Sequence, residues 1–353
     1  MPELATEVAL TCPAPLAARE RIVLGHGSGG RLSAELLRDI FLPLFSNPVL
    51  DRMDDQAVVE VGGARLAFTT DSFVVRPLFF PGGDIGSLAV HGTVNDLAMG
   101  GALPLYLSAG FILEEGFPTE ELRRIAASMA RAAAEAGVAI VTGDTKVVER
   151  GKGDGVFINT TGIGIVPNGV RLGANQARPG DRVILSGPIG DHGIAILAQR
   201  EGLEFDTEIL SDSAPLHNLV ARMLHTAAGA IRCMRDPTRG GVSSSLNEIA
   251  AQSGVSIRIE ETAIPVRDEV RGACELLGLD PLYVANEGKL IAIVGPEAVD
   301  EVLDAMRQDP RGAGAAVIGT AGEESPGLVT MRTAFGSTRI VDMLAGEQLP
   351  RIC

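Results

Sequence analysis

The stretch DDQAVVEVGGARLAFTTDS, residues 54–72, decides the fold of this chain. It contains two runs of β-type residues joined by Gly62-Gly63, and a Gly-Gly link between two such runs predicts a tight antiparallel hairpin. Asp54-Asp55 stand before the first run, and Asp71 stands after the second. We therefore expect two neighbouring strands whose ends carry carboxylates.

A glycine-rich segment precedes the hairpin. The pattern GxGxxG is matched by Gly25-His26-Gly27-Ser28-Gly29-Gly30, and Asp51 follows at about the spacing of a dinucleotide-binding fingerprint. The apolar run before it is only Ile22-Val23-Leu24, and the next helix leads to a hairpin and not to a parallel strand. We therefore interpret the segment as a loop whose backbone N–H groups can close over phosphates. A plain turn that caps the helix starting at Leu32 is the simpler alternative.

Helices and short strands alternate along the rest of the chain. Helical spacing of apolar residues predicts helices at 32–45, 85–99, 119–136, 215–227, 240–252, 268–278 and 297–308. Runs of β-type residues predict strands at 103–113, 138–142, 156–166, 182–186, 255–259, 290–294, 315–319 and 328–332. Several neighbouring strands are too close in sequence for βαβ crossovers, which favours an α+β fold over one doubly wound sheet.

The chain is long enough for two hydrophobic cores. Its 353 residues exceed the usual size of one core, and the polar, turn-rich stretch 167–179 is the candidate boundary. We therefore expect two mixed α/β domains between a loose arm and a flexible tail. The four segments are the arm 1–20, the first domain 21–170, the second domain 171–344 and the tail 345–353.

Composition narrows the class of protein. A hydrophobic fraction of 46% and a charged fraction of 21% suit a compact soluble chain, and a net charge of −15 would repel nucleic acid. No apolar run is long enough to span a membrane, and the acidic N-terminus lacks a signal-peptide pattern, so we expect a cytoplasmic protein. The four cysteines form no CxxC pair, which argues against a metal cluster.

Acidic residues of the first half recur near strand ends and glycines. They are Asp54, Asp55, Asp71, Asp96 in the predicted helix 85–99, and Asp144 just after the predicted strand 138–142. Mg²⁺ takes hard oxygen ligands and keeps several waters, so a few carboxylates and substrate phosphates can bind it. One such acid alone is more simply a solvated turn or helix cap, but the repetition favours a metal–nucleotide site. No GxxxxGK(S/T) sequence occurs, so any ATP site is not a P-loop.

The second half contains a charged turn before a predicted helix. Residues 235–241 read Arg-Asp-Pro-Thr-Arg-Gly-Gly, and either Asp236 or Thr238 could cap the helix. The two arginines beside a helix N-terminus would make an anion site, and solvated arginines on a capped turn are the alternative. Further on, Asn286-Glu287-Gly288 by itself reads as a turn.

The chain ends in Leu349-Pro350-Arg351-Ile352-Cys353. A thiol on a mobile tail can be offered to a second protein and then moved into a site of its own chain. The neighbouring terminal carboxylate disfavours the thiolate, so a partner would have to activate free Cys353. An accidental terminal cysteine is the alternative. The other cysteines, Cys12, Cys233 and Cys274, lie in less informative contexts.

Together these motifs resemble the HypE family of hydrogenase maturation factors, from near residue 20 to the end. Most are shared with the wider superfamily of aminoimidazole ribonucleotide synthetase and selenophosphate synthetase, whereas the terminal Pro-Arg-Ile-Cys points to HypE. The matching segments are 25–30, 54–57, 69–72, 94–100, 143–147, 235–241, 286–288 and 350–353.

The resemblance implies an aminoimidazole ribonucleotide synthetase-like fold whose N-terminal domain pairs through its sheet in a homodimer, with ATP near the interface. It also implies the activity of an ATP-dependent carbamoyl dehydratase, a carbon–oxygen lyase. In this family, HypF loads a carbamoyl group onto the terminal cysteine, and the thiocarboxamide is dehydrated to a thiocyanate. The cyano group then passes to iron on the HypC–HypD complex for [NiFe]-hydrogenase.

Two alternatives accompany this resemblance. A selenophosphate synthetase-like enzyme would have the same acidic residues. That family usually carries a reactive Cys or Sec near the glycine loop, but the glycine loop of this chain contains no cysteine. A nucleotide-regulated maturation scaffold is the alternative without catalysis.

The resemblance, read with the chemistry, assigns roles to the motif residues. Cys353 would carry the group, Glu287 would be the base with Lys146 or His91 as rivals, and Lys146 would steady the phosphoryl group. The expected Mg²⁺ ligands are Asp54, Asp71, Asp96 and Asp144. The expected ATP-binding residues are Gly27, Gly29, Gly30, Asp55, Thr70, Asp71, Asn95, Asp96, Thr145, Asp236 and Arg239.

Overall fold

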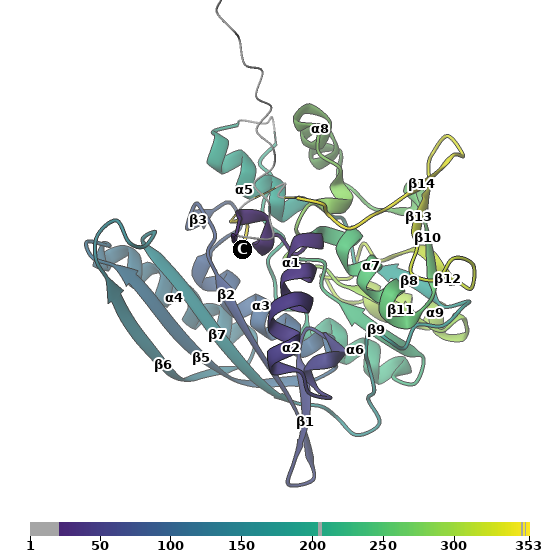
Figure 1. The fold of residues 1–353 in the computed structure, drawn as a ribbon, viewed down its shortest axis with the longest axis horizontal. Helices are drawn as coiled ribbons and strands as arrows, with labels where there is room; N and C mark the ends of the chain where they lie inside the picture. The colour runs from purple at the N-terminus through teal and green to yellow at the C-terminus, as the bar shows by residue number, and fades with distance from the viewer. Residues whose placement is uncertain (1–20, 204–206, 347–348, 350) are drawn as a thin grey trace, which may run out of the picture.

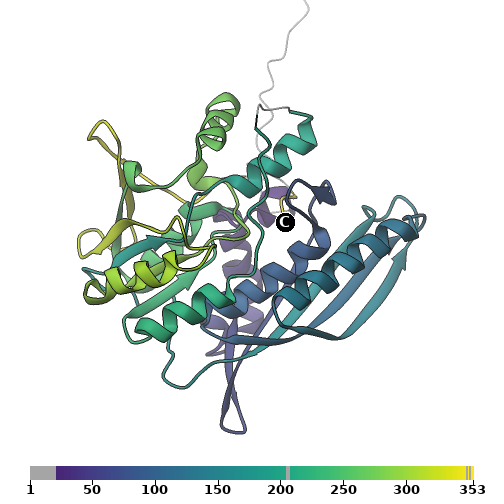
Figure 2. The same ribbon diagram turned by 180° about the vertical axis from the view of Figure 1, so that it is seen from behind.

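The computed structural model describes residues 21–203, 207–346, 349 and 351–353. The expected arm at 1–20 therefore lies outside the described residues. Two large β-sheets lie side by side, each with its own helices, and each belongs to one half of the chain (Figures 1 and 2). A third, two-stranded sheet is formed by β3 (Phe79–Phe80) and β4 (Gly83–Asp84). In the described part of the chain, no helix combines the length and the apolar character that crossing a membrane requires.

The N-terminal sheet has five strands in the order β1-β2-β7-β5-β6. Their bounds are β1 Ala57–Val61, β2 Ala64–Phe73, β7 Val156–Ile165, β5 Leu103–Glu114 and β6 Ala139–Val148. The predicted hairpin is confirmed, because β1 and β2 pair antiparallel across a turn in which Gly62 and Gly63 have φ angles of 58° and 82°. Glycine adopts such angles without steric strain.

Two helices cover one face of this sheet. α3 (Ile85–Met99) is almost wholly buried, and α4 (Thr119–Glu135) is amphipathic with Ile125 and Met129 in the core. Asp84 begins α3, because its carboxylate accepts hydrogen bonds from two backbone N–H groups of the first turn, at 2.8 and 3.0 Å. Figure 2 shows α3 and α4 in front of the strands, whereas in Figure 1 the opposite face of β5, β6 and β7 meets the viewer. We call that opposite face the open face.

The helix predicted at 32–45 is present as three consecutive segments. These are α1 (Arg31–Leu36), η2 (Leu37–Phe41) and α2 (Leu42–Phe45), and none of them contains a buried residue. Several of its apolar side chains, including Leu44 and Phe45, are exposed. An apolar helix that leaves its side chains uncovered is typical of an interaction surface.

The C-terminal sheet has seven strands in the order β14-β13-β10-β12-β8-β11-β9. The strands are β8 Arg182–Leu185, β9 Ile231–Arg235, β10 Ser256–Glu260, β11 Ile291–Val294, β12 Ala316–Gly322, β13 Val329–Arg332 and β14 Thr338–Ile340. The helices are α5 Asp191–Glu201, α6 His217–Ala227, α7 Gly241–Ser253, α8 Asp268–Leu277 and α9 Val299–Arg307. Alternate residues of β8 enter different cores: Val183 and Leu185 pack with α7, and Ile184 packs with α6 and α9.

Several sequence-based boundaries were wrong. β2 and β6 extend beyond their predicted ends, so Asp71 and Asp144 lie inside strands and not after them. α5 and β9 were not predicted, because a glycine-rich turn interrupts the start of α5 and arginines interrupt the apolar pattern of β9. The predicted cap of the helix at 240–252 was also wrong. α7 begins after Gly240, and neither Asp236 nor Thr238 caps it.

Candidate active site

The two halves of the chain meet at a cluster of buried and half-buried acidic side chains. Asp71 lies in β2, Asp96 in α3 and Asp55 just before β1, while Asp236 follows β9 and Glu287 precedes β11. The pKa values of Asp96, Asp236 and Glu287 are raised well above the ordinary range, first by burial and then by the other acids. Like charges that lie close together in a desolvated site resist ionisation. The site therefore favours ligands that bring positive charge.

Arg235 neutralises part of this charge and ties the two domains together. Its guanidinium bonds the carboxylate of Asp55, donates to the backbone oxygen of Met53 at 2.6 Å, and lies 3.6 Å from Glu248. Burial raises the pKa of Asp55, and Arg235 opposes that rise. Asp55 is thus bound to protein, and its predicted ATP contact stays a prediction.

Arg239 is the cation that faces the terminal cysteine. Cys353 is the largest influence that raises the pKa of Arg239, followed by the acids Asp71 and Glu287, while burial lowers it. One N–H group of Arg239 also donates to the backbone oxygen of Gly27 at 3.1 Å. A fixed guanidinium in this place can hold an anionic group beside the thiol.

Residues 351–353, at the end of the tail, lie in this site. The N–H of Val74 donates to an oxygen of Cys353 at 3.0 Å, and the N–H of Arg76 donates to the oxygen of Arg351 at 3.2 Å. Ile352 is buried in the N-terminal core. The tail was expected to be loose, but hydrogen bonds of the main chain and a buried apolar side chain hold its last residues.

The Cys353 thiol is half-buried beside a small cavity. Burial raises its pKa, Arg239 lowers it, and Glu287 and Asp71 raise it further. The seated thiol is therefore neutral and protected near pH 7. The adjoining cavity has a volume of about 130 Å³ and is lined in part by Ser28, Arg239 and Cys353, so a small group on the sulfur has room.

Glu287 is held by hydrogen bonds of its backbone, while one oxygen of its carboxylate has no partner among the described residues. Its N–H donates to Asp212 at 3.0 Å, and its carbonyl oxygen accepts from the amide of Asn95 at 3.3 Å. The side chain is only 3% exposed, yet its Oε1 atom has no hydrogen-bond partner among the described residues. A buried carboxylate oxygen without a partner is costly, which marks it as a group available to a ligand.

The acids suit Mg²⁺ only in combination with other oxygen donors. Within the described residues, no three His, Cys, Asp or Glu side chains converge closely enough to hold a metal. Thr69 donates to Asp96 at 2.8 Å, and Asp54 accepts from the N–H of Ala174 at 3.1 Å. Hard carboxylate oxygens used one or two at a time fit a Mg²⁺ ion that is completed by phosphates and water.

Three predicted site residues, Thr70, Asp144 and Lys146, lie on the open face. Lys146 lies 2.8 Å from Asp144 in an exposed pair, and this lysine lowers the pKa of Asp144. Thr70 shares the face, since the amide of Asn159 bridges Thr70 and Ser72 at 3.2 and 3.0 Å. Side chains alternate along a strand, so Asp71 and Thr145 point to the helix-covered side. A single protomer therefore does not bring Asp144 and Lys146 to Asp71.

Two predicted site residues on α3, His91 and Asn95, are four residues apart and share one face of the helix. His91 Nδ1 lies 3.0 Å from the hydroxyl of Ser213, and burial, followed by Arg311, lowers the pKa of His91 to about 4. Asn95 accepts from the N–H of Leu216 at 2.8 Å and donates to two backbone oxygens. These bonds join α3 to the loop before α6. Asn95 thereby positions Glu287 through its backbone.

The glycine loop packs against the arginine turn and the start of the tail. A Cβ atom on Gly29 would lie 2.6 Å from the oxygen of Arg239, and one on Gly30 would lie 2.2 Å from the oxygen of Leu344. Such approaches are closer than any side chain permits, and Gly29 also has a φ of 69°. The role of Gly27, Gly29 and Gly30 toward phosphates stays a prediction.

The same loop anchors the tail before it reaches the site. The N–H of Arg31 donates to the oxygen of Leu344 at 2.9 Å. The hydroxyl of Ser28 donates to the oxygen of Gly346 at 3.2 Å. Hydrogen bonds therefore hold the tail both before residue 347 and after residue 350.

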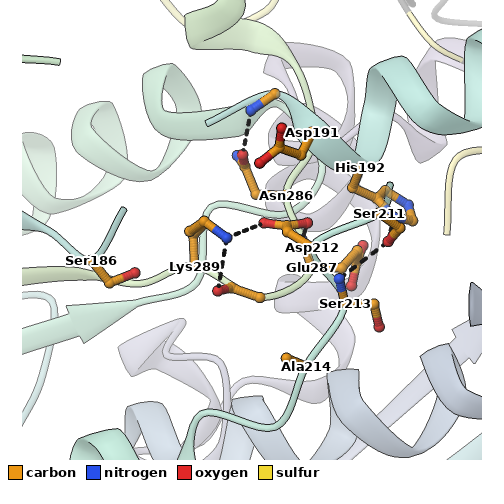
Figure 3. Close-up of polar contacts among 12 residues, drawn as sticks. Ser186, Asp191, His192, Ser211, Asp212, Ser213, Ala214, Asn286, Glu287 and Lys289 are labelled. Carbon is orange, nitrogen blue, oxygen red and sulfur yellow. Dashed lines mark hydrogen bonds and ion pairs between the residues drawn. The ribbon is translucent and has the colours of Figure 1, made fainter. Parts of the chain in front are cut away.

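A buried polar network behind Glu287 was not predicted (Figure 3). Asp212 and Lys289 form an ion pair of 2.9 Å whose side chains are 4% and 11% exposed. His192 bonds the oxygen of Ile352 through Nε2 and the hydroxyl of Ser211 through Nδ1, both at 2.8 Å. Polar residues after the glycine turn at 187–190 and in the loop 211–213 were the available signal.

Comparison with known proteins agrees with this geometry. The AIR synthase related protein family matches through its N-terminal domain at residues 53–166 and its C-terminal domain at residues 178–330. The chain is 62% identical to the carbamoyl dehydratase HypE of Azotobacter vinelandii, over 93% of this chain and 96% of that protein. The chain belongs to the HypE family of carbamoyl dehydratases. The HypE of Escherichia coli K12 is 48% identical over 94% of this chain and 99% of that protein.

Solved HypE structures share the fold. A HypE-HypF complex matches at 50% identity with a TM-score of 0.84, covering 88% of this chain and 99% of that chain. A HypE structure in complex with ATP matches at 52% identity with a TM-score of 0.80, covering 94% and 100%. A ThiL structure from Aquifex aeolicus is 20% identical with a TM-score of 0.64 over 89% and 99%, which indicates a common fold.

Proposed function

We propose that this member of the HypE family uses ATP to dehydrate a carbamoyl group on its own Cys353 to a thiocyanate. The product would supply cyanide ligands for the iron of [NiFe]-hydrogenase. The observation that carries the proposal is the seat of Cys353, which bonds the N–H of Val74, lines one cavity with Arg239, and has its pKa raised by Glu287 and Asp71. The substrate would be attached to the enzyme, and the tail would deliver it to a buried acid and a fixed cation.

The first step activates the amide oxygen, which is a poor leaving group. That oxygen attacks the γ-phosphorus of ATP, ADP leaves, and one of the two nitrogen protons is lost, which gives an imidate phosphate. Arg239 stands beside Cys353 and would spread the phosphoryl charge.

The second step forms the nitrile. The C–O bond breaks, phosphate leaves with the oxygen, and the second nitrogen proton is removed as the C≡N bond forms. Glu287 would take this proton, because its Oε1 lacks a partner and its backbone is held on both sides. Burial, followed by Asp236 and Asp71, raises the pKa of Glu287, so its carboxylate, once ionised, is a stronger base than that of an exposed glutamate.

Mg²⁺ would be held by Asp71 and Asp96 together with phosphate oxygens, with Asp236 close by. When bound, the ion supplies Lewis-acid stabilisation of phosphoryl charge. The negative charge of the buried acids favours such an ion, since it relieves their mutual repulsion. Asp54 would serve only if it exchanged its hydrogen bond to Ala174 for the metal.

A homodimer would bring a second chain onto the open face. Register and exposure place an unusually apolar set of side chains there, namely Phe68, Leu103, Tyr106, Ile112, Ile163 and Ile165. A sheet face of this character is typical of an interface, and the uncovered helix 31–45 adds to it. Lys146 and Asp144 would then lie at the interface, where the resemblance places ATP.

HypF would load the thiol, and the HypC–HypD complex would receive the cyano group. A HypE-HypF complex has been crystallised for a relative at 50% identity, which supports the first partner. Because seated Cys353 is half-buried, each partner would meet it after the tail has left its seat. We place these steps in the cytoplasm, where thiols stay reduced.

Replacing Glu287 tests the chemistry. Glu287→Gln should accept the carbamoyl group from HypF and carbamoyl phosphate, yet stall before dehydration, because a neutral amide cannot take the proton. Intact mass and the C-terminal peptide mass after addition of Mg-ATP separate the two states by one water. We expect the dehydration rate to fall by a factor on the order of 100 or more.

Two matched variants complete this experiment. Glu275→Gln changes an exposed glutamate on α8 and should dehydrate at the normal rate. Cys353→Ala should bind Mg-ATP normally and acquire no carbamoyl group. Dehydration by Glu287→Gln at the normal rate would remove Glu287 as the base, and a modification on Cys353→Ala would remove the carrier.

A further inference from the structure

A directed chain of hydrogen bonds ends on the seated tail. The N–H of Ser213 donates to the hydroxyl oxygen of Ser211 at 3.1 Å. That hydroxyl lies 2.8 Å from Nδ1 of His192, and Nε2 of His192 lies 2.8 Å from the carbonyl oxygen of Ile352. His192 itself is fully buried, with its ring edge-on to Phe80 at a centroid distance of 5.6 Å.

The chemistry of these partners decides the direction of each bond. A carbonyl oxygen only accepts, so Nε2 must carry the proton and Nδ1 must be the acceptor. The hydroxyl of Ser211 therefore donates to Nδ1, and its oxygen is free to accept from Ser213. Burial lowers the pKa of His192, which agrees with a neutral ring of one tautomer. The ring is thus fixed as a donor toward the tail.

This bond falls one residue before the thiol. On the other side, an oxygen of Cys353 accepts from the N–H of Val74 at 3.0 Å. The two bonds hold the backbone on both sides of the Cys353 Cα atom, so together they determine where its side chain can point. No other polar side chain described in the structure bonds the oxygen of Ile352.

The loop that orients His192 also holds the proposed base (Figure 3). Asp212 lies between Ser211 and Ser213 in sequence and accepts from the N–H of Glu287 at 3.0 Å. Lys289 fixes the other carboxylate oxygen of Asp212 at 2.9 Å. One three-residue loop therefore supports both the ring that bonds the tail and the backbone of Glu287.

We propose that His192 is a positioning residue that seats the tail and so presents the group on Cys353 to Glu287. This inference rests on the proposed function only for the identity of the group. The seat itself concerns the unmodified thiol. It has a readout without catalysis, because a thiol that leaves its seat becomes accessible to a neutral alkylating reagent.

The test measures the alkylation rate of Cys353 by N-ethylmaleimide, followed through the mass of the C-terminal peptide so that other cysteines do not contribute. His192→Phe keeps the ring and its packing but cannot donate to Ile352. Losing that bond should raise the alkylation rate on the order of tenfold, because the seated fraction falls. His192→Gln retains an N–H donor and should restore most of the protection. Ser211→Ala removes the hydroxyl that fixes the tautomer of His192, so its alkylation rate should lie between those of His192→Phe and His192→Gln.

The same variants then separate the seat from the function. With carbamoyl-loaded protein, His192→Phe should dehydrate more slowly, because the group is seated for a smaller fraction of the time. His192→Gln should recover, and Mg-ATP affinity should be unchanged in both. Equal alkylation rates in wild type and His192→Phe, both folded by thermal melt, would overturn the seat. If His192→Phe is alkylated faster but no protein dehydrates its carbamoyl group, wild type included, the proposed function is overturned. The seat of Cys353 is then still supported.

Discussion

Asp96 favours ligand binding and disfavours folding. It lies on α3 in contact with Thr69, and burial together with Asp236 and Asp71 raises its pKa well above the ordinary value. A folded state that holds a proton more tightly than the unfolded state loses stability when that proton leaves. The same repulsion is relieved when a cation binds. One side chain thus links the stability of the free protein to its affinity for metal and nucleotide.

Asp96→Asn should therefore stabilise the free protein and weaken Mg-ATP binding. The substitution removes the buried charge and keeps an oxygen that can accept from Thr69. At pH 8 we expect a gain on the order of 1–2 kcal/mol in the free energy of unfolding. The gain should shrink as the pH falls and vanish only below the ordinary pKa of 3.8, where wild-type Asp96 is protonated in both the folded and the unfolded state.

Urea denaturation at several pH values and titration calorimetry with Mg-ATP would measure the two effects. Asp39→Asn, an exposed carboxylate paired with Arg38, is the matched control and should change neither quantity appreciably. A destabilised Asp96→Asn, or one with normal Mg-ATP affinity, would contradict the account.

Among the elements, the glycine loop shows how backbone shape controls the site. Gly29 has a positive φ, and its backbone packs against the carbonyl of Arg239. Gly27 has an ordinary φ, and a Cβ atom placed on it would have no other atom within 4 Å. A side chain at Gly29 would separate the loop from the arginine turn that faces Cys353. The same change at Gly27 would meet open space.

Gly29→Ala should lower the free energy of unfolding by about 1–3 kcal/mol and speed the alkylation of Cys353, because the loop and the tail pack together. Gly27→Ala should stay within about 0.5 kcal/mol of wild type. Chemical denaturation of both proteins measures the difference. Equal stabilities would mean that the close contact at Gly29 is not maintained in solution.

Local pattern was sufficient for most regular elements, but it missed α5 and β9 and failed where polar residues continue a strand. The hairpin and α3 follow from glycine chemistry and apolar spacing, and both were predicted. The end of β6 reads as a turn because its Gly-Asp-Thr-Lys sequence is polar, yet it continues as an edge strand beside β5. Its partner strand and not its own composition makes it extended.

At the scale of the whole molecule, the sequence indicated which residues matter but not which of them meet. Asp71 and Asp144 looked equivalent as acids near strands, and only the register assigns them to opposite faces. His192 and Asp212 were missed because their partners are distant in sequence, at Ile352 and Glu287. Such contacts are set by tertiary packing, which no local pattern contains.

The open face yields a prediction about assembly. Phe68→Glu places a charge among the exposed apolar side chains of the N-terminal sheet and should convert a homodimer into monomers at micromolar concentration. Leu276→Glu changes an even more exposed residue on α8, away from this sheet, and should leave the dimer intact. Sedimentation velocity distinguishes the species. A wild-type protein that sediments only as a 36.8 kDa monomer would contradict the dimer.

The hydrogen bond that anchors the tail to the glycine loop limits how far a group on Cys353 can move from that loop. Gly346 is bonded to Ser28, and residues 347–353 are all that separates this anchor from the end of the chain. A fully extended segment of that length spans at most about 25 Å. While the anchor holds, every protein that loads or unloads the thiol must therefore come within this radius of the loop. The tail is a short tether, so the protein that loads the thiol and the protein that unloads it would compete for the same small patch of surface.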